Sequence, residues 1–148
     1  MKAVERHAHE VYPEECCGVL LGSSCRAGSQ VRVFASTAIA TRNDHPGPRE
    51  NRYSISLEEL LHAHRKAGHE GREVIGYYHS HPNRPAVPSA TDRELALPDI
   101  SYLIVSISSG GVRERRAWRL GAAGWGFEEE SIEPIGGQNV SEASEESE

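Results

Sequence analysis

The sequence predicts an α/β domain in which helices flank a β-sheet. Short runs of β-branched, aromatic and other apolar residues, typical of buried strands, recur along the chain. Segments with apolar residues at helical spacing lie between them. A length of 148 residues, 37% hydrophobic and 26% charged, is enough for one domain with a sizeable core. We therefore expect a single domain over residues 1–135.

The N-terminal half is expected to contain two helices and two strands. They are a helix end over 4–11, strands over 18–21 and 31–41, and a helix over 57–67. Pro13 should stop the first helix, and Gly22 should close the first strand. Either Ser54 or Ser56 can cap the second helix. The polar loop over 42–48 is expected to border a substrate channel.

The C-terminal half continues the sheet. The expected elements are strands over 74–78, 102–108, 117–120 and 125–132, with a short helix between Ser89 and Pro98. A Gly/Ala turn over 121–124 joins the last two strands, so the sheet should end in an antiparallel pair. Residues 136–148 are rich in Gly, Ser and Glu, and we expect a disordered acidic tail there.

Charge and composition exclude several classes of partner. The net charge of −6 and the pI near 5.8 argue against nucleic-acid binding, which needs a basic stripe. No segment is apolar over the length needed to span a membrane, and the first residues do not form an apolar signal region. Three cysteines without a CxxC pair do not form a disulfide framework. We expect a cytoplasmic protein.

The strongest chemical signal follows the strand over 74–78. His79 and His81 are two residues apart, so on an extended chain their side chains project to the same side. Prolines interrupt the chain after them, and Ser89 then caps a short helix with Asp92 in its first turn. Two imidazoles and a carboxylate suit Zn²⁺, and three protein ligands leave a fourth position open, as in catalytic zinc sites.

A simpler interpretation explains some of the same residues. Ser89 and Asp92 fit a capping box, and His79 and His81 can be ordinary, partly buried histidines. A capping box, however, does not require two histidines at the end of a strand. We therefore favour the metal site, although capping accounts for Ser89 and Asp92 as well.

His-Ser-His-Pro at 79–82, followed by Ser89 and Asp92, resembles the signature of the JAMM (MPN+) zinc metalloproteases, E…H-[ST]-H-x7-S-x2-D. The segment over 12–22 is similar to the glutamate segment of that family, E-x-C-G followed by a hydrophobic strand. The resemblance spans about residues 7–134. It implies a JAB/MPN fold, with a mixed, mostly antiparallel sheet flanked by helices and an architecture related to that of the cytidine deaminases. Deaminase chemistry itself needs a P-C-x-x-C pair that this chain lacks.

The resemblance also implies roles for site residues. His79, His81 and Asp92 would hold Zn²⁺, and Ser89 would donate a hydrogen bond to the oxyanion of the tetrahedral intermediate. Glu15 would be the general base.

Which glutamate acts as the base is not decided by periodicity. Glu14 and Glu15 are adjacent at the head of one strand, and their side chains should point to opposite faces. The similarity to E-x-C-G selects Glu15.

The implied reaction is hydrolysis of peptide or isopeptide bonds after the C-terminal Gly-Gly of a ubiquitin-like or sulfur-carrier protein, including release of cysteine from a carrier. The alternative is a non-catalytic MPN-type binding module for a ubiquitin-like partner.

Overall fold

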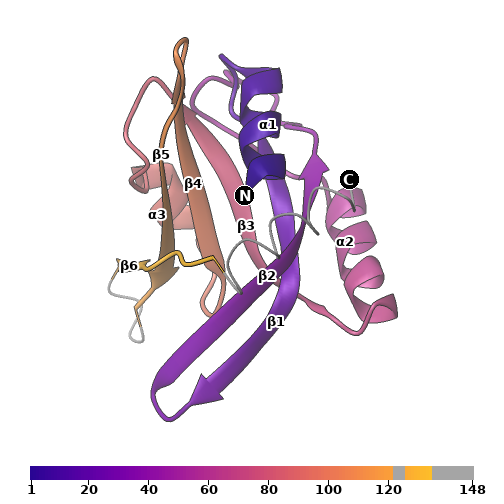
Figure 1. Ribbon diagram of the computed structural model, residues 1–148. Coiled ribbons are helices and arrows are strands. Elements are labelled where there is room, and N and C mark those ends of the chain that lie inside the picture. Colours follow the sequence, from indigo (N-terminus) through magenta and orange to yellow (C-terminus); the bar gives the residue numbers. More distant parts are fainter. Residues whose placement is uncertain (122–125, 135–148) are drawn as a thin grey trace.

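A computed structural model describes residues 1–121 and 126–134, and its strands form one six-stranded sheet in the order β2-β1-β3-β4-β5-β6 (Figure 1). The elements are α1 (Lys2–Val11), β1 (Cys17–Ala27), β2 (Gln30–Thr41), α2 (Leu57–His69), β3 (Glu73–Pro82), α3 (Ala90–Leu95), β4 (Ser101–Ser108), β5 (Gly111–Leu120) and β6 (Phe127–Glu130). β3 and β4 are parallel, whereas the other neighbours are antiparallel. The predicted mixed, mostly antiparallel sheet flanked by helices is confirmed.

Alternating residues of the central strands pack against different helices. On one face, Leu20 of β1 lies in a cluster with Val4 and Ala8 of α1. On the other face, Val19 and Leu21 pack with α2 residues Ala63 and Ala67. Because successive strand side chains point to opposite faces, this uninterrupted apolar run fits a strand covered on both sides.

The first strand is longer than its apolar run predicted. Gly22 does not close it, because β1 continues to Ala27 and pairs with β2 as a long hairpin whose tip extends beyond the helices (Figure 1). The pairing shifts register between Leu21 and Gly22, where an added Cβ would lie only 1.8 Å from the carbonyl oxygen of Phe34. The outer half of β1 is exposed and carries polar residues, so its pairing left no apolar pattern in the sequence.

The later elements also differ from the prediction at their ends. β5 begins at Gly111 instead of residue 117, so it contains the arginine-rich stretch, and β6 ends at Glu130. Arg116 and Arg119 form ion pairs with Glu129 and Glu130 of β6, so side-chain contacts accompany the pairing of these two strands. Trp125, residues 122–124 of the predicted turn and the expected tail lie outside the described residues.

The predicted helices agree more closely with the structure. α1 begins at Lys2 and ends before Pro13, and Ser56 is the cap of α2, where its hydroxyl accepts a hydrogen bond from the Glu59 amide at 3.2 Å. Among the residues that the structure describes, no helix combines the length and apolarity needed to cross a membrane.

We predict that Gly76→Ala destabilises the fold. Gly76 pairs with β1 on one side and β4 on the other, and an added Cβ would lie 2.4 Å from the carbonyl oxygen of Ser101. Backbone must move to relieve this contact, so the free energy of unfolding measured in urea should fall by about 2–3 kcal/mol.

Gly68→Ala is the matched control, because an added Cβ there meets no atom within 4 Å and the residue lies in α2. The free energy of unfolding of this variant should rise by about 0.5–1 kcal/mol. Equal unfolding midpoints for the two variants would contradict the packing assigned to Gly76.

Candidate metal centre

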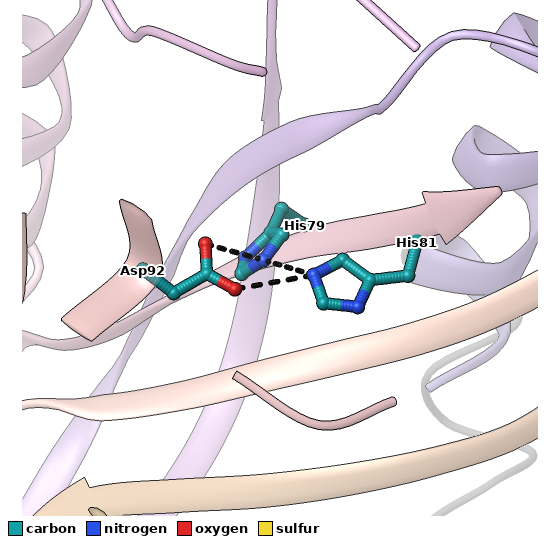
Figure 2. Close-up of side chains that lie close together, drawn as sticks. All are labelled: His79, His81 and Asp92. Atoms are coloured by element: carbon teal, nitrogen blue, oxygen red, sulfur yellow. Dashed lines mark hydrogen bonds and ion pairs between the residues drawn. The ribbon is translucent and has the colours of Figure 1, made fainter. Parts of the chain in front are cut away.

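Three side chains that the sequence predicted as metal ligands converge in the structure. One ligand atom from each of His79, His81 and Asp92 lies within 4.8 Å of the others. The two Nε2 atoms are 3.2 Å apart, and they lie 3.2 and 3.1 Å from Oδ1 and Oδ2 of Asp92, respectively. Figure 2 shows the carboxylate facing both imidazoles.

The two histidines come from the C-terminal part of β3. Their alternate positions place both rings on the α2 face of the sheet, and each residue is 1% exposed. β3 is paired on both sides here, with Cys17 of β1 and Ile104 of β4 opposite His79. The strand that carries the histidines is therefore held by hydrogen bonds to a neighbour on each side at His79.

A capping box holds Asp92, the third candidate ligand. Ser89 Oγ accepts a hydrogen bond from the Asp92 amide at 3.1 Å, and Asp92 Oδ2 accepts one from the Ser89 amide at 2.8 Å. The same carboxylate faces His79 and His81. The Asp92 side chain therefore caps α3 and also faces the two histidines. The two explanations that the sequence left open are compatible.

The donor set fits a tetrahedral metal ion. Bonds of about 2.0–2.2 Å place neighbouring ligand atoms about 3.3–3.6 Å apart, close to the separations between these three side chains. His81 Nδ1 lies 2.8 Å from the carbonyl oxygen of Pro85. When a metal occupies the site, the ring proton can stay on this Nδ1 and leave the Nε2 lone pair for the ion. Such a backbone partner is what orients a metal-binding histidine.

The charges of the site also suit a cation. Burial lowers the pKa of His79, which favours the neutral ring that binds metals. Burial alone would raise the pKa of Asp92, but hydrogen bonds from His79 and His81 outweigh it and hold that pKa well below its usual range. Asp92 is therefore an anion at neutral pH.

Glu15 is a buried carboxylate two residues before β1, and it is 2% exposed. Cys17 is opposite His79, so two more residues along the antiparallel strands bring Glu15 opposite His81, on the same face. Two hydrogen bonds extend the pairing: the Ser80 amide donates to the Cys16 carbonyl at 3.1 Å, and the Cys16 amide donates to Ser80 Oγ at 2.8 Å. The backbone thus positions Glu15 beside the ligands.

The Glu15 carboxylate forms an ion pair with Arg84. Burial raises the pKa of Glu15 to about 8, although Arg84 opposes the shift. Glu14, by contrast, is only partly buried, and no ion pair is recorded for it among the described residues. The two adjacent glutamates thus have different environments, although neither lies in a strand as predicted, because β1 begins only at Cys17.

The segment between β2 and α2 lies against the site. Tyr53 stacks on His79 with ring centroids 4.5 Å apart, and Arg52 Nη1 donates to Thr91 Oγ1 of α3 at 2.8 Å. Asn43 ties this segment to β1, since its Nδ2 donates to the carbonyl oxygens of Glu15 and Arg52 at 3.0 and 2.8 Å. The loop predicted to border a channel therefore contacts the backbone of Glu15.

Sequence reasoning missed Tyr53, Asn43 and Arg84. None belongs to a spaced motif or a periodic pattern, and each meets the site through a loop. A hollow of about 280 Å³ lies beside Glu15 and is bordered by Arg42, Asn43 and Arg49, but none of the three candidate ligands lines it.

We predict that Glu15→Gln stabilises the metal-free protein at alkaline pH. The pKa of Glu15 is raised from 4.5 to about 8, so the folded protein binds this proton more tightly than the unfolded chain does. Stability must then fall as pH rises through this range. Glutamine avoids that loss, so the variant should match wild type near pH 4 and exceed its free energy of unfolding by a few kcal/mol above pH 8.

Urea unfolding of chelator-treated protein across this pH range measures the difference. Glu14→Gln is the control and should follow the wild-type curve, because Glu14 is only partly buried. A constant difference between Glu15→Gln and wild type at every pH would contradict the raised pKa.

Comparison with known proteins gives a consistent result. Residues 1–121 match the family described as prokaryotic homologs of the JAB domain. Desampylase of Haloferax volcanii is 40% identical over 96 residues, which is 64% of this chain and 63% of that protein. The chain thus matches less than two thirds of that relative's length. CysO-cysteine peptidase of Mycobacterium tuberculosis is 31% identical over 121 residues, 81% of this chain and 77% of the other.

Solved structures agree with the fold. A protein from Desulfitobacterium hafniense superposes with a TM-score of 0.74 at 30% identity, over 90% of this chain and 86% of the other. A protein from Salinibacter ruber gives a TM-score of 0.69 at 33% identity, over 93% and 88% of the two chains. Since the family match covers most of the chain and includes all three residues of the candidate metal centre, the chain belongs to the prokaryotic JAB-domain family.

Proposed function

We propose that this chain is a zinc-dependent hydrolase that cleaves peptide or isopeptide bonds after the C-terminal Gly-Gly of a ubiquitin-like or sulfur-carrier protein. The observation that carries the proposal is the convergence of His79, His81 and Asp92 on the same face as the buried carboxylate of Glu15. Metal ligands beside a buried base are the parts that water-mediated amide hydrolysis needs.

In this proposal His79, His81 and Asp92 hold Zn²⁺. Zinc supplies Lewis-acid chemistry, making water acidic enough to act as a nucleophile near neutral pH. Three protein ligands are the number found in catalytic zinc sites, whereas structural sites use four.

Glu15 is the proposed general base. It takes a proton from the attacking water and passes it to the leaving amine. Its pKa near 8 is close to physiological pH, which suits a group that must both accept and release a proton. Its backbone is held on both sides, because its amide donates to the Arg49 carbonyl at 2.7 Å and its carbonyl accepts from Asn43.

Ser89 is the proposed donor to the developing oxyanion. In the capping box its Oγ accepts a hydrogen bond from the Asp92 amide, which uses a lone pair of the oxygen. The hydroxyl hydrogen is not used in that bond and can be donated to substrate. Ser89 can therefore cap α3 and stabilise the oxyanion together.

The substrate class rests on the relatives. Two of them are named desampylase and CysO-cysteine peptidase, and we extend to this chain the hydrolysis of ubiquitin-like or sulfur-carrier conjugates. Only residues 96–100 separate α3 from β4, so this side of the site carries no long insertion. We also propose a cytoplasmic location, consistent with the two buried free thiols Cys16 and Cys17.

The alternative is a non-catalytic binding module that keeps the fold without the metal. An intact ligand set and a buried glutamate beside it count against this alternative. Metal content separates the two, because a module of this kind would purify without zinc and still bind a ubiquitin-like partner.

We predict one zinc ion per chain. His79→Ala, His81→Ala and Asp92→Ala should each lose most of it, because each removes one of only three protein ligands. Elemental analysis of the purified proteins measures this, with Glu15→Gln as a control that should keep its zinc. A full complement of zinc in Asp92→Ala would remove Asp92 from the ligand set.

We predict that Glu15→Gln lowers turnover of a Gly-Gly peptide conjugate by on the order of 10²–10⁴-fold, since glutamine cannot accept the proton of water. Zinc content and substrate binding should be retained. Glu14→Gln is the matched control and should be close to wild type. The reverse pattern in the two variants would show that the base is assigned to the wrong glutamate.

A further inference from the structure

We propose that Arg84 makes the site selective for substrates whose leaving group is a single amino acid with a free α-carboxylate. The guanidinium would bind that carboxylate beside Glu15. This inference rests on the proposed function, because it names the substrate class of the same hydrolytic site.

Arg84 contacts the proposed base directly. Its Nη2 donates to Glu15 Oε2, and its side chain is 30% exposed, so part of it is open to a bound molecule. Its Nε is buried without a hydrogen-bond partner. A guanidinium has five N–H donors, and among the described residues Glu15 is the only partner recorded for this one. Arg84 therefore has donors to spare.

The backbone around Arg84 is unusually well anchored. Ser106 Oγ donates to the Arg84 carbonyl at 2.5 Å, the Asn83 amide donates to the Ile107 carbonyl at 2.7 Å, and His81 Nδ1 contacts the Pro85 carbonyl. The next residue, Ala86, is bonded through both its amide and its carbonyl, to Glu114 and to Trp118 at 3.0 Å each. These bonds involve main-chain atoms, so the loop would hold the backbone at position 84 in a fixed place.

The chemistry of the leaving group connects this arginine to substrate choice. In the proposed reaction the leaving nitrogen must come within hydrogen-bond reach of Glu15 to receive a proton. In an α-amino acid, the carboxylate is attached to the carbon that bears that nitrogen. It therefore lies near the guanidinium that touches Glu15, and arginine binds carboxylates through two parallel hydrogen bonds.

A lysine side chain offers no such group, because the carbon next to its ε-nitrogen carries no carboxylate. An isopeptide-linked protein would thus leave the spare donors of Arg84 without an anionic partner. Arg52 adds positive charge near Glu15, but its Nη1 is engaged by Thr91 of α3. Arg84, whose guanidinium contacts the Glu15 carboxylate directly, is accordingly a cation placed to distinguish the two kinds of leaving group.

The test compares two peptides that end in Gly-Gly-Ala, one a free acid and the other a C-terminal amide, with full-length zinc-loaded protein. We expect wild type to cleave the acid with a kcat/KM about ten- to a hundredfold higher than the amide. Arg84→Gln should abolish this ratio mainly by slowing cleavage of the acid, and Arg84→Lys should keep part of it. Arg52→Gln removes a nearby charge and should keep the ratio.

Binding provides a second readout that does not depend on turnover. In the zinc-loaded Glu15→Gln protein, calorimetry should show the acid peptide bound about ten- to a hundredfold more tightly than the amide. Adding Arg84→Gln should remove the difference. Because the bonds that anchor the loop are made by main-chain atoms, this variant should fold, and its thermal unfolding checks that.

The outcomes separate the two proposals. A wild type that cleaves neither peptide, while Glu15→Gln prefers the acid, contradicts the proposed function and supports the role of Arg84. Equal cleavage of acid and amide by wild type overturns the role of Arg84 alone. If Arg84→Gln lowers both rates equally, the ratio of acid to amide cleavage stays unchanged. Arg84 would then be only a positioning residue for Glu15.

Discussion

The pairing of β1 with β3 is the constraint on which the site depends. Cys17 lies opposite His79, and the hydrogen bonds between Cys16 and Ser80 continue the pairing to the point where Glu15 faces the histidines. A shift by one residue would turn Glu15 to the α1 face, because strand side chains alternate. The apolar residues that follow in β1 pack against both helices and so maintain this register.

The two carboxylates of the site have pKa values shifted in opposite directions. Asp92 meets two imidazoles and the Ser89 amide, and its pKa is lowered, whereas Glu15 is buried with Arg84 as its ion-pair partner, and its pKa is raised. Two carboxylates whose environments separate their pKa values are suited to different tasks. In the proposed reaction Asp92 remains an anionic ligand while Glu15 carries a proton.

Sequence reasoning succeeded where the chemistry is local. His79, His81, Ser89 and Asp92 lie within a short stretch of chain, so strand alternation and helix capping placed them without knowledge of the sheet. It failed where position depends on contacts distant in sequence. Arg84 meets Glu15 across 69 residues, and the stacking of Tyr53 on His79 depends on a loop whose course Asn43 determines. No propensity encodes either contact.

The outer half of β1 illustrates the same limit at the level of the fold, since its polar residues pair with β2 only because the inner half sets the register. Asp92, the third proposed ligand, shows how far such dependence extends. α3 buries none of its residues, so packing does not hold it in place. The position of α3 depends on the capping box, on the hydrogen bond between Arg52 and Thr91, and on the contacts of the Asp92 carboxylate with the two histidines. Asp92 is thus both a proposed ligand and one of the few anchors of its own helix, which couples the position of that helix to the occupancy of the site.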